Sequence, residues 1–332
     1  MAEKTGFCFG VQRAYDLALS ATKIKKDPLC SLGPLIHNPQ VVGFLEGEGL
    51  KVVADPDEVS AGDRVVIRSH GVSPQIFEQL KKRGAQIVDA TCPFVKKAQE
   101  KLTQLEKEGY QVLLLGDHRH AEVQTLLGYA KSKVKIISGP SDLTSLDLGG
   151  RVGLVSQTTQ RKTVLQEVAD ALISKVDELR IFNTICGFTA KRLEVALQMA
   201  RRVGLLLVVG GRNSANTCRL TEACHEILPD TYHIEGPGEI DLAWIKSNFQ
   251  IGVTAGASTP EWVISEVLRR IQELVFAREK RKPAMVFLTS WRIIGGTADN
   301  DGRDSGAEEQ RGGQSKKRGN GNLRTKSLRI VC

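Results

Sequence analysis

The sequence predicts an α/β protein made of three pseudo-equivalent domains, each with a mostly parallel sheet. Two observations support this prediction. Segments typical of buried strands alternate with segments of helical periodicity along most of the chain. A pattern of one cysteine, a helix and two polar turns also occurs three times, and such a repeat indicates the architecture more strongly than any single residue.

Each repeat begins at a cysteine that precedes a helical segment. Cys8, Cys92 and Cys186 stand 84 and 94 residues apart, and each is followed closely by an aromatic residue and a helix with basic side chains in its first turns. The stretches read GFCFGVQRAYDLALSA, DATCPFVKKAQEKLTQL and NTICGFTAKRLEVALQMA. Unpaired backbone amides at the start of a helix lower the pKa of a thiol. We therefore predict a chemical role for these three cysteines.

The first polar turn keeps its distance from the cysteine in all three repeats. His37, His120 and Ser214 follow the cysteine of their own repeat by 29, 28 and 28 residues. A loop precedes each of them and a helical segment follows, so we expect the three side chains to occupy equivalent positions.

The second polar turn follows the next strand of each repeat. His70, Thr158 and Ser258 occupy this turn, at 62, 66 and 72 residues after the cysteine. Differences in loop length easily account for this variation in spacing.

We place the domain boundaries close to the cysteines. The predicted parts are three α/β repeat domains and a low-complexity basic tail, at residues 1–92, 93–186, 187–280 and 281–332.

The composition is that of an ordinary globular protein. Of the 332 residues, 41% are hydrophobic and 25% are charged. The longest apolar run, VGLLLVVGG, is too short to span a bilayer, and the N-terminus has no signal-peptide pattern. We therefore expect a cytoplasmic protein without a membrane segment. The seven cysteines then favour thiols used in chemistry or buried in cores over a disulfide framework.

The formal charge of +8 is concentrated at the C-terminal end. Residues 281–332 contain 11 Lys and Arg against 5 Asp and Glu, which leaves the rest of the chain nearly neutral. This tail is rich in Gly and charge and poor in apolar residues, a composition typical of disorder. Its basic cluster could contact phosphates weakly, but the nearly neutral body argues against nucleic acid as a partner.

Three equivalent domains around a common axis would form a trefoil and bring the three cysteines together at its centre. Soft thiolate ligands select zinc, copper(I) or an iron-sulfur cluster. None of the three cysteines belongs to a C-x-x-C pair, which argues against a zinc ribbon and a thioredoxin-like site. Three thiolates would leave one iron of a cubane cluster free to bind another ligand.

The polar turns predict an anion pocket. Imidazoles, hydroxyls and an amide near helix starts suit a phosphate or a diphosphate. The candidate residues are His37, His70, His120, Thr158, Ser214, Asn216 and Ser258. The alternative is a three-histidine zinc site with an open water position. The third repeat favours the anion, because it has Ser and Asn at the equivalent positions.

Glu122 is the carboxylate within these turns that we nominate for proton transfer. A Glu in a partly desolvated site keeps a proton near neutral pH and acts as a general acid. The alternative role is an ordinary acidic residue that complements the dipole at a helix start.

The sequence resembles the 4-hydroxy-3-methylbut-2-enyl diphosphate reductases, the LytB family, over roughly residues 5–275. The resemblance depends on the number and order of several stretches, GFCFGV, HNPQVV, RSHGVSP, DATCPFV, HAEVQTLLG, SQTT, NTIC, RNSAN and GVTAGASTP. These enzymes catalyse the last step of the non-mevalonate isoprenoid pathway. The resemblance implies a reductive dehydroxylation that gives isopentenyl and dimethylallyl diphosphates.

The resemblance also implies roles for individual residues. Cys8, Cys92 and Cys186 match the ligands of a 4Fe-4S cluster, whose free iron takes the allylic hydroxyl of the substrate. Glu122 and Thr158 match the pair beside that hydroxyl, with Glu122 implicated in proton delivery. The matching diphosphate-binding positions are His37, His70, His120, Ser214, Ala215, Asn216 and Ser258. The implied electron donor is a ferredoxin or a flavodoxin.

Three features depart from the pattern of that family. Family members usually have a short hydrophobic strand before the first cysteine, whereas MAEKTGF precedes Cys8 here. Ala215 stands where many members have a second serine, so one hydroxyl contact worth about 1 kcal/mol is lost. The residues after about 280 match nothing in the family. Two rival functions stay open, a zinc hydrolase that uses the histidines and a non-enzymatic phosphate-ligand or nucleic-acid binding protein.

Overall fold

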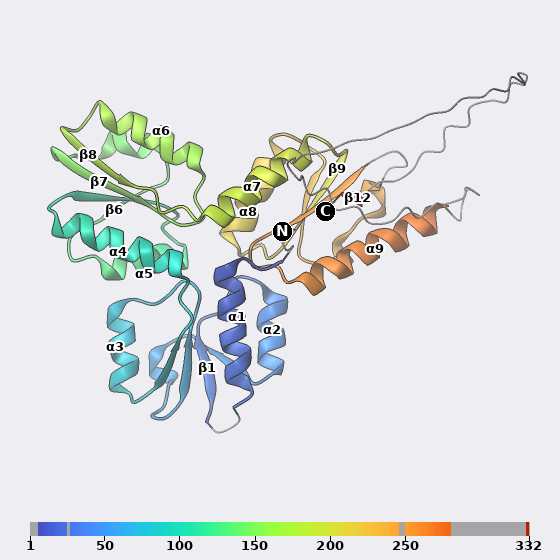
Figure 1. Cartoon of the computed structure of the whole chain (residues 1–332), viewed down its shortest axis with the longest axis horizontal. Helices are drawn as coiled ribbons and strands as arrows, with labels where there is room; N and C mark the ends of the chain where they lie inside the picture. The colour runs from blue at the N-terminus through green and yellow to red at the C-terminus, as the bar shows by residue number, and fades with distance from the viewer. Residues whose placement is uncertain (1–5, 25–26, 246–249, 280–329, 332) are drawn as a thin grey trace, which may run out of the picture.

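The computed structural model describes residues 6–24, 27–245, 250–279 and 330–331. The described chain forms three lobes that meet at a common centre (Figure 1). Each lobe contains one four-stranded sheet, and all strand pairs in the three sheets are parallel. The predicted α/β class with parallel sheets is therefore confirmed.

The first lobe is formed by the N-terminal third of the described chain. Its sheet has the order β2-β1-β3-β4. The strands are β1 (Leu29–Leu32), β2 (Leu50–Val53), β3 (Arg64–Ile67) and β4 (Gln86–Asp89). The helices are α1 (Phe9–Thr22), α2 (Pro39–Gly47) and α3 (Pro74–Lys82), and the 3-10 turn η1 (Pro56–Glu58) precedes β3.

The second lobe repeats this topology with the order β6-β5-β7-β8. Its strands are β5 (Gln111–Leu115), β6 (Lys135–Ile137), β7 (Arg151–Ser156) and β8 (Glu178–Phe182). Its helices are α4 (Pro93–Lys107), α5 (Ala121–Tyr129) and α6 (Lys162–Ile173), with the 3-10 turn η2 (Pro140–Ser145) before β7.

The third lobe has the order β10-β9-β11-β12. The strands are β9 (Leu205–Val209), β10 (Thr231–Ile234), β11 (Ile251–Ala255) and β12 (Ile330–Val331). The helices are α7 (Gly187–Ala200), α8 (Ala215–His225) and α9 (Glu261–Glu279), with 3-10 turns η3 (Pro237–Glu239) and η4 (Leu242–Trp244).

The edge strand β12 distinguishes the third sheet from the other two. In the first two lobes the equivalent edge strands, β4 and β8, run directly into the loops of Cys92 and Cys186. In the third lobe, by contrast, the two residues of β12 come from the far C-terminal end and pair with Ile251 and Gly252 of β11. The predicted tail otherwise lies outside the described residues, and the domain boundaries near residues 92 and 186 stay a prediction.

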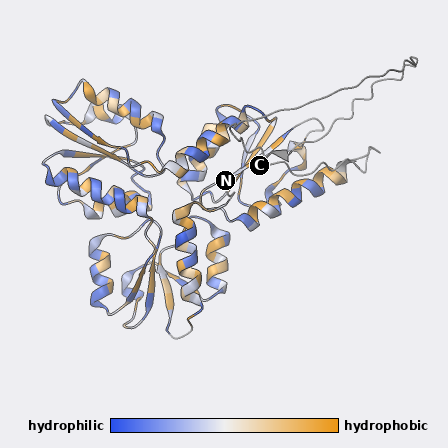
Figure 2. Ribbon diagram, in the orientation of Figure 1, coloured by the Kyte–Doolittle hydropathy of each residue, from blue (hydrophilic) through white to orange (hydrophobic). Residues whose placement is uncertain are grey.

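The strands form because short apolar runs are covered by helices on both faces of each sheet, as parallel sheets require. Figure 2 shows apolar residues along the central strands and on one side of most helices. Strand β9, LLLVV, is buried along its whole length. Six clusters of buried apolar side chains, two in each lobe, make up the core. Among the helices in the described ranges, none has the length and apolar character needed to cross a bilayer.

The packing of α4 on the second sheet leads to a stability prediction at Gly153. A Cβ atom on Gly153, in the middle of β7, would lie 2.7 Å from both methyl carbons of the buried Leu105. We expect Gly153→Ala to lower the free energy of unfolding by about 1–3 kcal/mol, because overpacking forces neighbouring side chains to shift. Gly139→Ala is the control, since a Cβ atom there meets nothing within 4 Å. Urea unfolding curves measure the difference, and coincident curves for both variants would contradict the prediction.

Candidate functional site

Three cysteines stand at the starts of the helices that open the three lobes. Cys8, Cys92 and Cys186 are the N-cap residues of α1, α4 and α7, all with extended backbone. Their thiols make no capping hydrogen bond, whereas the N-cap side chains Asn38 and Ser73 each accept one from a backbone N–H. The cysteine side chains therefore do not cap the N-termini of these helices.

The backbone of each cysteine is held by the preceding lobe in the cyclic order. The N–H of Cys92 donates to the carbonyl of Ser69 at 2.9 Å, and that of Cys186 donates to Thr158 at 2.8 Å. The N–H of Cys8 donates to Ala257 of the third lobe at 3.0 Å, which closes the ring. Each acceptor carbonyl belongs to or adjoins a second polar turn, so the same turns position both the cysteines and the polar side chains.

Arginines from α1 and α7 support the same junctions. Arg13 donates to the carbonyls of Asp89 and Thr91 at 3.2 and 3.3 Å. Arg192 donates to the carbonyls of Ala255 and Gly256 at 3.0 Å and to the carbonyl of Gly6 at 2.8 Å. Both arginines belong to the basic first turns noted in the sequence, and both bind backbone carbonyls at or just after a strand end of their own lobe.

The three thiols lie close enough for one thiol to affect the pKa of another electrostatically. Burial raises the pKa of Cys8, and the thiol of Cys186 contributes to the same direction. Burial also raises the pKa of Cys92 to about 11, with smaller contributions from Cys8 and Cys186. A Cβ atom on Gly10, in α1, would lie 2.4 Å from the sulfur of Cys92. Glycine is therefore required where the first lobe approaches this sulfur.

The expectation that the helix starts lower these pKa values is wrong for Cys8 and Cys92. Nearby backbone amides, such as those of Val11 and Phe94, do act in the lowering direction. The loss of hydration on burial is larger and disfavours the thiolate. A bound metal centre opposes this effect, because metal binding favours the deprotonated thiol.

The cysteines share one cavity of about 90 Å³ with every other residue that the sequence analysis nominated. Its lining includes Cys8, Cys92, Cys186, His37, His70, His120, Glu122, Thr158, Ser214, Ala215, Asn216 and Ser258. It also includes Ser69, Thr159 and Thr189, which the sequence analysis did not select. Residues from all three lobes therefore meet around a single small space.

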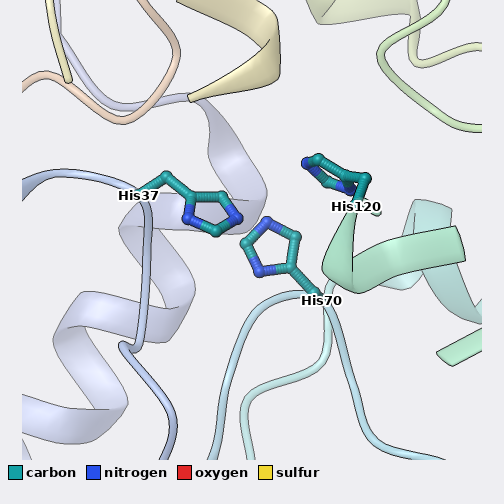
Figure 3. A group of neighbouring side chains, drawn as sticks. All are labelled: His37, His70 and His120. Atoms are coloured by element: carbon teal, nitrogen blue, oxygen red, sulfur yellow. The ribbon is translucent and has the colours of Figure 1, made fainter. Parts of the chain in front are cut away.

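Three histidines form a compact group on one side of this cavity. Figure 3 shows the rings of His37, His70 and His120 turned toward one another. The ring centre of His37 lies 4.4 Å from that of His70 and 5.4 Å from that of His120. His37 and His70 come from loops, and His120 is the N-cap of α5. The Nδ1 atom of His120 accepts a hydrogen bond from the N–H of Glu122 at 3.1 Å.

Burial keeps these histidines neutral. The three residues are half-buried as a whole, and both ring nitrogens of His37 and Nδ1 of His70 are fully buried. Burial lowers the pKa of His37, lowers that of His70 well below its usual value, and lowers that of His120 to about 4. Neutral imidazoles each offer one N–H donor and one acceptor.

Several buried polar atoms around the cavity have no partner among the residues that the structure describes. They are both ring nitrogens of His37, Nδ1 of His70 and Nδ2 of Asn216. Buried polar groups are normally hydrogen-bonded, so a cluster of unpaired ones indicates a place for a polar ligand. Ser214 and Ser258 stand beside them, and the hydroxyl of Ser258 donates to the carbonyl of His37 at 3.1 Å.

Glu122 and Thr158 form a buried pair. The Glu122 carboxylate accepts hydrogen bonds from the N–H of Thr158 at 2.7 Å and from its hydroxyl at 2.8 Å. Glu122 is 1% exposed. Burial raises the pKa of Glu122, although the bonds from Thr158 and the charge of Arg219 act in the opposite direction. A carboxyl group in this setting keeps its proton at a higher pH than an exposed one.

The three histidines also satisfy the geometry of a metal site. Their ligand atoms lie within 4.8 Å of one another, and within the described ranges this is the one group of His, Cys, Asp or Glu side chains that meets this condition.

The comparisons with known proteins agree with one another. The family model described as "LytB protein" matches residues 1–272. A relative from Geobacter sulfurreducens, named 4-hydroxy-3-methylbut-2-enyl diphosphate reductase, is 47% identical over 273 residues, covering 82% of this chain and 96% of the relative. A protein of the same name from Citrifermentans bemidjiense is 46% identical over 274 residues, with the same coverage of both chains.

Two solved structures are also similar. One is described as (E)-4-hydroxy-3-methyl-but-2-enyl diphosphate reductase, the terminal enzyme of the non-mevalonate pathway; it has a TM-score of 0.62 and 40% identity over 81% of this chain and 96% of that one. The other, an E-1-hydroxy-2-methyl-but-2-enyl-4-diphosphate reductase from Plasmodium falciparum, has a TM-score of 0.76 and 27% identity over 82% of this chain and 86% of that one. The family match, the relatives and the shared fold lead to one conclusion: this chain belongs to the LytB protein family.

Proposed function

We propose that this protein is an iron-sulfur reductase that converts 4-hydroxy-3-methylbut-2-enyl diphosphate to isopentenyl and dimethylallyl diphosphates. The observation that carries the proposal is the single cavity in which three cysteines, three histidines and the Glu122–Thr158 pair meet. The names of the relatives supply the substrate and the reaction. The chemistry of the cavity supports both.

The cysteine set suits an iron-sulfur cluster. The three residues that would hold it are Cys8, Cys92 and Cys186, one from the start of each lobe. Their thiols line one cavity and influence one another electrostatically. Cysteine thiolates are the usual ligands of iron-sulfur clusters, and a 4Fe-4S cluster when bound supplies single electrons and a Lewis-acidic iron for the substrate hydroxyl.

The diphosphate occupies the histidine side of the cavity in this proposal. His37, His70 and Asn216 have buried polar atoms without protein partners, and an anionic ligand would accept hydrogen bonds from their N–H groups. Further contacts come from His120, Ser214 and Ser258, and from the backbone beside Ala215 at the start of α8. Binding energy from this remote, unreacting group orients the hydroxyl-bearing carbon toward the cysteines.

Glu122 supplies a proton in this proposal. Replacing the C–O bond by C–H and releasing water consumes two electrons and two protons. Hydroxide is a poor leaving group, so protonation of the departing oxygen lowers the barrier. Thr158 holds the Glu122 carboxyl through both its N–H and its hydroxyl, which fixes the direction in which the proton is offered.

The electrons require a donor, for which we propose a ferredoxin or a flavodoxin acting in the cytoplasm. The reaction itself is tested on protein purified without oxygen, with dithionite and a redox mediator as the electron source. We expect conversion of the substrate to the two isoprenoid diphosphates. Substrate that stays intact with a fully loaded cluster would contradict the proposal.

A zinc hydrolase is the second candidate, because the histidine nitrogens have the spacing of a three-histidine zinc site. It predicts release of phosphate from the substrate without any reductant, and activity that depends on added zinc. The reductase predicts no turnover without electrons. The same reaction mixture with and without dithionite therefore separates the two candidates.

The first prediction concerns the cysteines. We expect Cys186→Ser to lose most of the bound iron and its visible absorption, because a hydroxyl is a poor replacement for a thiolate ligand. Turnover should fall with the iron. Cys218→Ser is the matched control, since Cys218 lies in α8 and its sulfur contacts the carbonyl of Arg212 instead of the cavity. Full iron content in Cys186→Ser would remove Cys186 from the ligand set.

The second prediction concerns Glu122. We expect Glu122→Gln to slow turnover about 100-fold or more while the cluster absorption stays unchanged, since general acids contribute about 100- to 10,000-fold. Burial raises the pKa of Glu122, and the acid must be protonated to act. The parent rate should therefore fall as pH rises through this pKa, and the variant should lack that fall.

The exposed Glu100 of α4 provides the control variant Glu100→Gln, for which we expect parental rates at every pH. A pH–rate profile of kcat measures both effects. Parental turnover in Glu122→Gln, or the same alkaline fall in that variant, would show that another group delivers the proton.

The third prediction concerns the anion pocket. We expect His37→Asn to raise the dissociation constant of the substrate by about 10- to 100-fold, because a hydrogen bond to a charged group contributes about 1.5–3 kcal/mol. Titration calorimetry with the oxidised protein measures binding without turnover. The exposed His225 of α8 gives the control His225→Asn, which should bind like the parent. Equal affinities for all three proteins would exclude His37 from the pocket.

A further inference from the structure

Arg219 links the third lobe to the second beside the cavity. It lies one turn into α8 and reaches across to the turn that follows β7. Its Nη1 atom donates to the hydroxyl of Thr159 at 2.7 Å, and its Nη2 atom donates to the side-chain carbonyl of Gln157 at 3.4 Å. The guanidinium group therefore binds both neighbours of Thr158, the residue that holds Glu122.

The turn at residues 157–159 is a closed hydrogen-bonded unit. The side-chain amide of Gln157 donates to the Thr159 hydroxyl at 2.9 Å, and its carbonyl accepts from the N–H of Asp117 at 3.0 Å. Gln157 is fully buried. Arg219 thus completes a network that already ties this turn to the loop between β5 and α5, and α5 carries Glu122.

Thr158 sits at the centre of this unit and has two further partners. Its N–H and hydroxyl bind the Glu122 carboxylate, and its carbonyl accepts the N–H of Cys186. A displacement of the turn would therefore change the position of the carboxyl group. The backbone bond to Cys186 and the strand β7 hold one side of the turn, and Arg219 holds the other.

Helix α8 connects this contact to the anion pocket. Its N-cap is Ser214, and Asn216 lies in its first turn, so both line the cavity one turn before Arg219. Arg219 is not among the residues that line the cavity. Its direct hydrogen bonds go to Gln157 and Thr159, so its geometric effect on the site passes through the turn at residues 157–159.

We propose that Arg219 is a positioning residue: by holding Gln157 and Thr159 it fixes Thr158, and through Thr158 it aligns the Glu122 carboxyl with the bound substrate. This inference deepens the proposed reductase function and depends on the role of Glu122 in it. Because α8 also carries Ser214 and Asn216, the same helix sets the place of the diphosphate and the place of the acid. The charge of Arg219 acts on Glu122 as well, in the direction that lowers the pKa of Glu122.

The test compares Arg219→Met and Arg219→Lys with a control in the same interface. Arg161 of the second lobe pairs with Glu226, next to the end of α8, at 3.4 Å. Arg161→Met therefore removes a cationic contact between the same two lobes without touching the turn. We expect Arg219→Met to lower kcat about 10- to 100-fold, the usual effect of losing a supporting partner, with KM changed less than about twofold. Arg219→Lys should keep part of kcat, because a lysine can still bind one of the two acceptors, the Thr159 hydroxyl or the Gln157 side-chain carbonyl.

A double-mutant cycle with Glu122→Gln shows whether Arg219 acts through Glu122. We expect Arg219→Met to lower kcat in the parent but not in the Glu122→Gln background. Equal fold-losses in both backgrounds, or parental kcat in Arg219→Met, would overturn the proposal. A parallel loss of iron and of thermal stability that accounts for the lower kcat would also overturn it, because it would indicate a structural role alone.

An infrared measurement keeps the test independent of turnover. The carboxyl band of Glu122 is assigned by its disappearance in Glu122→Gln. We expect this band to shift in Arg219→Met and to keep its position in Arg161→Met, because only the first variant loosens the hydrogen bonds from Thr158. An unshifted band in Arg219→Met would overturn the positioning role. Absence of reductase activity in the parent would instead count against the proposed function.

Discussion

The structure depends on one repeated interaction, the backbone hydrogen bond that ties each helix-start cysteine to a polar turn of the neighbouring lobe. Cys92, Cys186 and Cys8 donate to Ser69, Thr158 and Ala257 in turn. Because the last of these bonds joins the third lobe to the first, the three lobes form a closed ring with the thiols inside it. A closed ring fixes the thiols relative to one another without any direct bond between them.

The same turns combine two kinds of chemistry in one small space. Their backbone carbonyls hold the cysteines, while their side chains and helix starts face the cavity as donors. Burial keeps the histidines neutral and raises the pKa of Glu122, so the groups around the cavity carry little charge of their own. Two kinds of bound group would stabilise such a site. An anion would accept hydrogen bonds from the unpaired donors, and a metal centre would favour the deprotonated thiols.

Much of this arrangement could be predicted from sequence because it is repeated. The spacing of cysteine and polar turn, kept in three copies, selects the three cysteines and six of the polar cavity residues, whereas Ser69, Thr159 and Thr189 have no such repeated position. What the sequence could not show is contact between lobes. Arg219 looks like an ordinary basic residue of a helix, and only the packing of α8 against the second lobe brings it to Thr159. The sequence also predicts the wrong pKa direction for Cys8 and Cys92, since the depth of burial depends on all three lobes. The origin of β12 in residues 330–331 also has no local signal.

The central claim is that the three cysteines hold one iron-sulfur cluster. Iron, acid-labile sulfide and zinc can be measured together in protein that has been purified without oxygen. The account predicts about four iron and about four sulfide per chain, with little zinc. About one zinc per chain without sulfide would contradict it and favour the three-histidine site.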